Sequence, residues 1–133
     1  MTQEQKELLL KDLCARLPYG VMCQVDDGAA GLNDGKLVEI DISKELVRFD
    51  ADYHWDAYID DIKPYLFPLS SMTEEQKKVF DQCIELELKA ISDEIDHTQS
   101  TAFEVDFYNK HHFDWRGLIP MGLAIDATGL NIY

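Results

Sequence analysis

The chain has 133 residues, 46% of them apolar, and it carries 26 acidic against 12 basic residues. This length and apolar content are typical of a single globular domain, here residues 1–133. The net charge of −14 disfavours direct binding to nucleic acid or to an anionic membrane, and it favours a protein partner with a basic surface. No stretch has the length and apolarity of a membrane span or a signal core, so we expect a cytoplasmic protein.

The three cysteines, Cys14, Cys23 and Cys83, are widely spaced and form no CxxC pair. This pattern argues against a disulfide framework and against a structural zinc site. We expect reduced thiols packed in the core.

Residues 1–17 are predicted to form the first helix. Thr2 and Gln5 have the spacing of a capping box, and the segment LPYG ends the helix. Apolar side chains recur at helical spacing at Leu9, Leu10, Leu13, Cys14 and Leu17.

Residues 20–63 change to a period of two, which predicts short strands in VMCQV, KLVEIDIS, ELVRF and the segment from Trp55 to Ile59. The side chains expected to face the core are Val38, Ile40, Ile42, Val47 and Phe49. Together with the helices, this pattern predicts an α+β fold with a small, bent antiparallel sheet, for which an SH3-like barrel is one form.

Pro64 and Pro68 predict a rigid connector after the sheet. Thr73 and Gln76 then repeat the capping-box pattern at the start of a helical part spanning residues 73–112, interrupted by SDEIDHTQS and resumed from about residue 100. The side chains expected to point inward from its first helix are Val79, Phe80, Cys83, Ile84, Leu88 and Ile91.

The stretch DFYNKHHFDWRGLIP contains two adjacent histidines, His111 and His112. On a helical arc both fall on the buried side, whereas Asn109 falls on the polar side. Helical metal sites use ligands three or four positions apart, so adjacency argues against a metal site. We expect His111 or His112 to bond to a helix-terminal carbonyl, or to Glu104 or Tyr108 on the same face.

Residues 113–133 form an apolar tail that is predicted to pack on the body. Asp114 is expected to cap the following turn, and Arg116 to be partly buried, to pair with a carboxylate of the acidic sheet and to hold the tail. The apolar residues expected to fold the tail back are Phe107, Phe113, Trp115, Leu118 and Ile119.

Acidic and aromatic residues alternate in DADYHWDAYIDD, which lacks the glycine and glutamate of an EF-hand loop and shows no positioned carboxylate pair for glycosidase chemistry. This segment is either a solvated acidic strand or a protein-interaction surface, and a narrower alternative is a mimic of a phosphate backbone. The candidate interaction residues are Asp50, Asp52, Tyr53, Trp55, Asp56, Tyr58, Asp60 and Asp61.

Motifs for catalysis are absent: there is no GxSxG, P-loop or GxGxxG sequence. We therefore predict no catalytic, cofactor-binding or metal-binding residue, and a protein that is not an enzyme. A metal-dependent hydrolase built on His54, His111 and His112 is the alternative that this prediction has to exclude.

The segments IDDIKPYLFPLSSMTEEQ, HHFDWRGLIPMGLAIDATGLNIY and KDLCARLPYGVMCQV resemble a family of short, acidic, uncharacterised proteins encoded by gut Bacteroidales genomes, often among phage-like or mobile genes. The resemblance touches the beginning, middle and end of the chain. It implies an origin, and by analogy a role in host interaction, but it carries over no functional residue.

Overall fold

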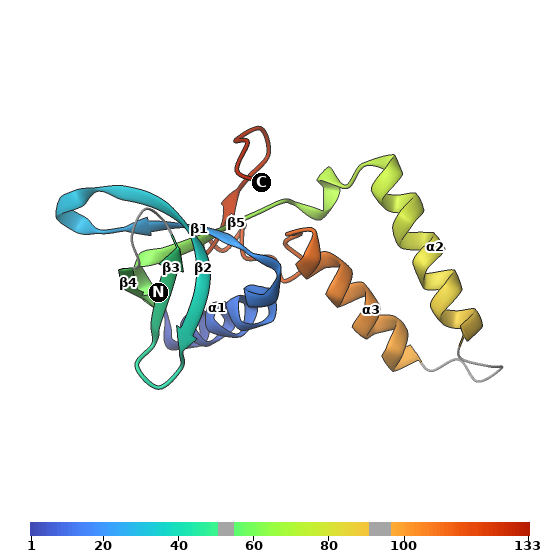
Figure 1. Ribbon diagram of the computed structural model, residues 1–133, viewed down its shortest axis with the longest axis horizontal. Helices are drawn as coiled ribbons and strands as arrows, with labels where there is room; N and C mark the ends of the chain where they lie inside the picture. The colour runs from blue at the N-terminus through green and yellow to red at the C-terminus, as the bar shows by residue number, and fades with distance from the viewer. Residues whose placement is uncertain (51–54, 91–96) are drawn as a thin grey trace.

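The computed structural model describes residues 1–50, 55–90 and 97–133 and has an α+β architecture (Figure 1). A sheet and helix α1 (Gln3–Arg16) form one end of the molecule, and a hairpin of helices α2 (Glu74–Ala90) and α3 (His97–Lys110) forms the other. Short 3₁₀ turns connect several of these elements, namely η1 (Leu17–Tyr19), η2 (Gly28–Ala30), η3 (Ile59–Asp61) and η4 (Leu69–Ser71).

Both predicted capping boxes are confirmed. Thr2 Oγ1 accepts from the Gln5 amide at 3.1 Å, and the Gln5 side chain accepts from the Thr2 amide at 3.0 Å. Thr73 and Gln76 make the same reciprocal pair at the start of α2, at 3.1 and 2.9 Å. Each box satisfies amides that a helix start leaves without intrahelical partners.

The sheet is open, with strand order β4-β3-β2-β1-β5-β6, so the SH3-like barrel, one form expected for this sheet, is not confirmed. Closure needs hydrogen bonds between the first and last strands, and here β4 and β6 lie at opposite edges. Neighbouring strands are antiparallel except β5 and β6, which are parallel. The strands are β1 (Met22–Asp26), β2 (Leu32–Asp41), β3 (Leu46–Asp50), β4 (Trp55–Tyr58), β5 (Ile62–Leu66) and β6 (Ile125–Asp126).

A β-bulge in β2 overturns part of the predicted core face. The pairing with β3 shifts between Leu37 and Glu39, so Leu37 is buried while Val38 is exposed. A bulge inserts one residue and reverses the alternation of side chains beyond it. Of the three predicted core residues in this segment, only Ile40 packs against the core, whereas Val38 and Ile42 face solvent.

Strand β5 occupies a segment that was expected to be a connector. Pro64 lies opposite Cys23 of β1, and β6 pairs only with Tyr65 and Leu66 farther along. A proline has no amide hydrogen to donate, and a position with a strand partner on one side only tolerates that loss. Pairing with β1 and β6 thus outweighs the local proline signal.

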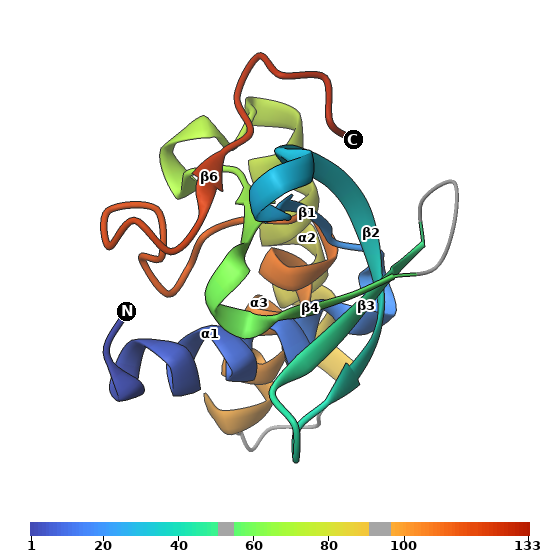
Figure 2. The ribbon, with the colours of Figure 1, turned by 90° about the vertical axis from the view of Figure 1, so that its left-hand side faces the viewer.

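Helix α1 covers the inner face of the sheet (Figure 2). Leu9 and Leu13 are fully buried against strand residues that include Val47 and Phe49, as predicted for those two strand positions. Leu118 and Leu123 of the tail complete the same cluster. Burial of these apolar side chains is the main stabilising contribution to this half of the molecule.

Helices α2 and α3 pack mainly on each other through aromatic side chains. The Phe80 ring lies 4.9 Å from that of Phe107 and 5.6 Å from that of Tyr108. Because α2 buries only the stripe that faces α3, Phe80 and Ile84 are partly covered while Val79 is 50% exposed. The prediction that Val79 points inward is therefore wrong, and the side chains at the predicted positions 83, 88 and 91 lie outside the described part.

Candidate protein-interaction site

The side of strands β2, β3 and β4 that faces away from α1 forms a solvent-exposed surface, which we call the outer face. Strand register and burial assign to it Lys36, Val38, Glu39, Asp41, Leu46, Arg48, Asp50, Asp56 and Tyr58. Apolar side chains stand among these charges: Val38 is 40% exposed and Tyr58 is 61% exposed. A surface of this composition resembles the rim and anchor residues of protein interfaces.

Arg48 organises the charges of the outer face across three strands. Its Nε donates to Asp56 Oδ1 at 3.0 Å and its Nη1 donates to Glu39 Oε2 at 2.9 Å. The hydrogen bond that Arg48 donates to Asp56, followed by the charge of Glu39, raises the pKa of Arg48. Carboxylates and cations are therefore interleaved, and the outer face is not a continuous acidic row.

A hollow of about 100 Å³ opens in the outer face. Carboxylates, cations and two apolar residues line it. They are Glu39, Asp41, Lys44, Leu46, Val47, Arg48 and Asp56. Ser43 donates a hydrogen bond to Asp41, which lowers the pKa of that carboxyl group and keeps it ionised beside the hollow. The hollow therefore carries three carboxylates against two cations, Lys44 and Arg48.

The structure does not bring all the predicted interaction residues together. Asp50, Asp56 and Tyr58 lie on the outer face, whereas Asp60 and Asp61 line a separate hollow of about 180 Å³ beside Asp26, Leu32 and Lys63. Lys6 of α1 lies 3.3 Å from Asp60 and 3.3 Å from Glu45. The predicted residues Asp52 and Tyr53, and the side chain of Trp55, lie outside the described residues.

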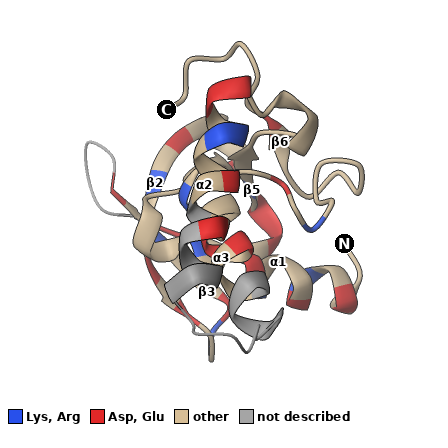
Figure 3. Ribbon diagram, turned by 90° about the vertical axis from the view of Figure 1, so that its right-hand side faces the viewer, with Lys and Arg blue, Asp and Glu red and all other residues tan. Residues whose placement is uncertain are grey.

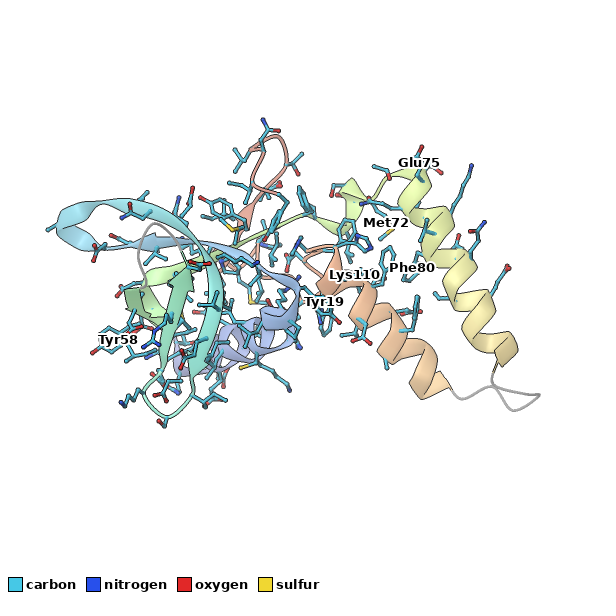
Figure 4. All side chains as sticks on the ribbon, viewed as in Figure 1. Tyr19, Tyr58, Met72, Glu75, Phe80 and Lys110 are labelled. Carbon is cyan, nitrogen blue, oxygen red and sulfur yellow. The ribbon has the colours of Figure 1, made fainter. Side chains whose placement is uncertain are left out.

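Acidic residues, red in Figure 3, are spread over helices and strands on the side of the molecule that this view shows. Tyr58 lies at the opposite end of the molecule from the α2–α3 hairpin (Figure 4). The outer face is thus separated from the aromatic packing between the helices.

A buried charge cluster joins α1 to the tail, and the sequence reading missed it. Asp12 and Arg16 are both 0% exposed. Arg16 Nε donates to Asp12 Oδ2 at 2.7 Å, and Arg16 Nη2 donates to the Phe113 carbonyl at 2.7 Å. The available signal was an Asp and an Arg four positions apart on the same helical face as Leu9 and Leu13.

Arg116 is partly buried, as predicted, but its partner is Asp12 of α1 and not a carboxylate of the sheet. Its Nε lies 3.2 Å from Asp12 Oδ1 in an ion pair without hydrogen-bond geometry, and its guanidinium group lies 4.0 Å from the Trp115 ring centroid. The pairing differs from the prediction because the tail runs over α1, which places the helix carboxylate within reach.

The predicted cap at Asp114 is confirmed. Asp114 Oδ1 accepts from the Leu118 amide at 2.7 Å, and Oδ2 accepts from the Ile119 amide at 2.9 Å. A carboxylate that accepts two backbone amides in a buried site fixes the turn that follows it.

The two histidines are half-buried, but the predicted hydrogen bonds from their rings are wrong for the described residues. His112 stacks on Tyr133 with ring centroids 3.7 Å apart, and its Nδ1 has no described partner. The His111 ring packs 4.4 Å from that of Phe107. Both rings therefore act in packing, and neither has an acid–base partner among the described residues.

His112 also ends α3. Its φ of 63° lies in the left-handed region, its amide donates to the Asn109 carbonyl, and the Phe113 amide donates to the Tyr108 carbonyl. These two bonds form a Schellman motif, in which glycine or asparagine usually holds this position. Asn109 was predicted to face solvent but is 3% exposed, because its side chain accepts from Trp115 Nε1 at 2.9 Å.

Acid is expected to destabilise the protein through His112. Burial first, then the charges of Arg16 and His111, lower the pKa of His112 to about 4 from its ordinary value of 6.5. Between these two pKa values, His112 is protonated in the unfolded chain but not in the folded chain. The free energy of unfolding therefore decreases as pH falls from about 6.5 toward 4. The slope has an upper limit of about 1.4 kcal/mol per pH unit for one group.

The measurement is urea unfolding between pH 7 and pH 4.5 for the wild type and for His112→Asn. Asparagine tolerates the left-handed region, so the variant keeps the helix end while losing the titrating ring. The difference in unfolding free energy between the two proteins is expected to shift in favour of the variant at low pH. Parallel pH profiles would show that His112 contributes nothing to acid sensitivity.

A further cavity of about 240 Å³ lies between the start of α2, the end of α3 and the tail. Phe67, Phe113 and His111 line it together with hydroxyl groups. Ser71 Oγ is already bonded to the Pro68 carbonyl, and Thr73 Oγ1 serves as the cap of α2. Two of the three hydroxyl groups in the lining are thus used by the local structure, whereas Thr128 and the ring of His111 also line this cavity.

Among residues 1–50, 55–90 and 97–133, no group of three or more histidine, cysteine, aspartate or glutamate side chains is placed to hold a metal ion. In the same residues no helix combines the length and apolarity required to cross a membrane. Burial raises the pKa of the Cys23 thiol, which makes this cysteine a poor nucleophile.

No protein family, curated protein or solved structure matches the chain.

Proposed function

We propose that this protein is a non-enzymatic interaction module of phage or mobile-element origin, and that its outer face binds a partner protein with a basic surface. The observation that carries the proposal is the exposure of Val38 and Tyr58 among carboxylates on a sheet face that no described element covers. Apolar and aromatic anchors inside a charged rim favour association over simple solubility. The origin rests on the resemblance of the sequence motifs alone.

Charge complementarity defines the partner. The whole chain carries a net charge of −14, and three carboxylates against two cations line the hollow of the outer face. A basic surface would be attracted at long range and then oriented by the apolar contacts. Mimicry of nucleic acid is less well supported, because Lys36 and Arg48 interrupt any row of carboxylates on this face.

Affinity capture from host lysate tests the proposal, with the immobilised wild type compared with the triple variant Asp50→Asn, Asp56→Asn and Tyr58→Ser. The wild type is expected to capture a specific basic protein, and the variant to capture about tenfold less of it. The reason is that the variant has lost two negative charges and one exposed aromatic side chain. Higher salt should weaken capture by the wild type, since exposed charges are screened.

A matched control changes the opposite end of the molecule. Glu74→Gln, Glu75→Gln and Val79→Ser remove the same two charges and one exposed apolar side chain from α2. This control should capture the partner as the wild type does. Equal loss in both variants would mean that net charge alone governs binding, and equal capture by all three proteins would contradict a role for the outer face.

A further inference from the structure

Among the described residues, strand β4 is an edge strand with no strand partner on its outer side, next to the outer face. It is the first strand in the sheet order, and its partner in the described part of the chain is β3. Natural edge strands with unpaired backbone groups accept an added strand from another chain when side chains favour that chain.

The phase of the β3–β4 ladder identifies the backbone groups at this edge. The Ile59 amide donates to the Glu45 carbonyl at 3.1 Å, and Ala57 lies opposite Val47 in the same register. Hydrogen-bonded and non-hydrogen-bonded pairs alternate along an antiparallel ladder, so Ala57 directs its amide and carbonyl toward β3. Asp56 and Tyr58 then direct theirs away from the sheet.

The side chains of Asp56 and Tyr58 determine which side chains an added strand would need. Asp56 and Tyr58 both project from the outer face, and Asp56 lies 3.0 Å from Arg48. A strand added at this edge would place its own side chains directly beside them. Net negative charge favours basic residues in that strand, and the exposed Tyr58 ring favours an apolar neighbour.

We propose that β4 binds an extended, basic segment of the partner as an added strand, through the backbone groups of Asp56 and Tyr58. This inference rests on the proposed function and specifies how the partner is held. Backbone pairing supplies the hydrogen bonds, and the outer face selects a segment with a basic and an apolar residue two positions apart, on the same side of the added strand.

A short synthetic peptide with a lysine and a valine two positions apart, and threonine at the other positions, is the probe. The same peptide N-methylated at every residue is its control. The two peptides carry equal charge, but the second cannot donate backbone hydrogen bonds. We expect the unmodified peptide to bind about tenfold more tightly. Amide exchange measured by NMR should slow at Tyr58 on binding, while Ala57, already paired with β3, serves as the internal reference.

Equal binding of both peptides with unchanged exchange at Tyr58 would overturn the added strand. The proposed function would survive that result if the triple variant of Asp50, Asp56 and Tyr58 lost both peptides. Failure of the unmodified peptide to bind would also overturn the added strand, and lysate capture by the same triple variant would then decide separately whether the outer face binds a partner.

Discussion

Replacing Asp12 with alanine is expected to lower the free energy of unfolding by about 3–5 kcal/mol. Asp12 is fully buried, and its carboxylate pairs with both Arg16 and Arg116. Its removal leaves the guanidinium group of Arg16 buried with the Phe113 carbonyl as its remaining hydrogen-bond partner in the described chain. Urea unfolding followed by circular dichroism at pH 7 measures the loss.

Two control variants separate the buried charge from the loss of volume. The double variant Asp12→Leu with Arg16→Met leaves no uncompensated charge between these positions, so it should be clearly more stable than Asp12→Ala. Glu39→Ala breaks an ion pair of comparable length on the outer face, where Arg48 is 46% exposed, and should change stability little. A loss below about 1 kcal/mol for Asp12→Ala would contradict the importance of the cluster.

Replacing Asp114 with alanine is expected to cost about 2–4 kcal/mol, because two backbone amides lose their acceptor. Asp114 is 7% exposed, and the amides of Leu118 and Ile119 bond to its two oxygens. Leu118 is itself part of the core cluster, so a loosened turn also exposes apolar surface. Thermal or urea unfolding measures the cost, and faster exchange of the two amides locates it.

Asp114→Asn is the matched variant, since it keeps one acceptor oxygen and the shape of the side chain. It should lose about half as much stability as Asp114→Ala. Asp126→Ala provides a second comparison, because that carboxylate accepts from the Thr128 amide at an exposed position and its loss should matter little. If Asp114→Ala unfolds like the wild type, the cap does not hold the tail.

The charge cluster around Asp12 and the cap at Asp114 hold the tail in different ways. The charge cluster binds the tail to α1 through Arg16, Arg116 and the Phe113 carbonyl, whereas Asp114 organises the tail within itself. His112 lies between them, with its ring on Tyr133 and its backbone at the end of α3. The Tyr133 hydroxyl donates to the Tyr65 carbonyl and accepts from the Met22 amide, which extends the same connection to the sheet.

The outer face shows why the candidate site was only partly predictable. Asp50, Asp56 and Tyr58 were recognisable from their position in an acidic, aromatic segment, and the strand register places all three on one side. Val38 was expected in the core, and no local sequence pattern predicted the β-bulge that places its side chain on the outer face. The pairing of β2 with β3 decides that bulge, and residues distant in sequence determine the pairing.

Local chemistry within a few residues was readable from the sequence itself: the two capping boxes, the cap at Asp114, the start of α1 and the inward positions of Val47 and Phe49. Each depends on a hydrogen bond or a side-chain period that neighbouring residues define.

Only the tertiary structure decided the open sheet, strand β5 through Pro64, the burial of Asp12 with Arg16, and the partner of Arg116. These features depend on contacts between segments far apart in the chain. A buried charge, or a strand that contains a proline, is stabilised by a partner in another element of the fold. The periodicity of the sequence does not show which residue that partner is.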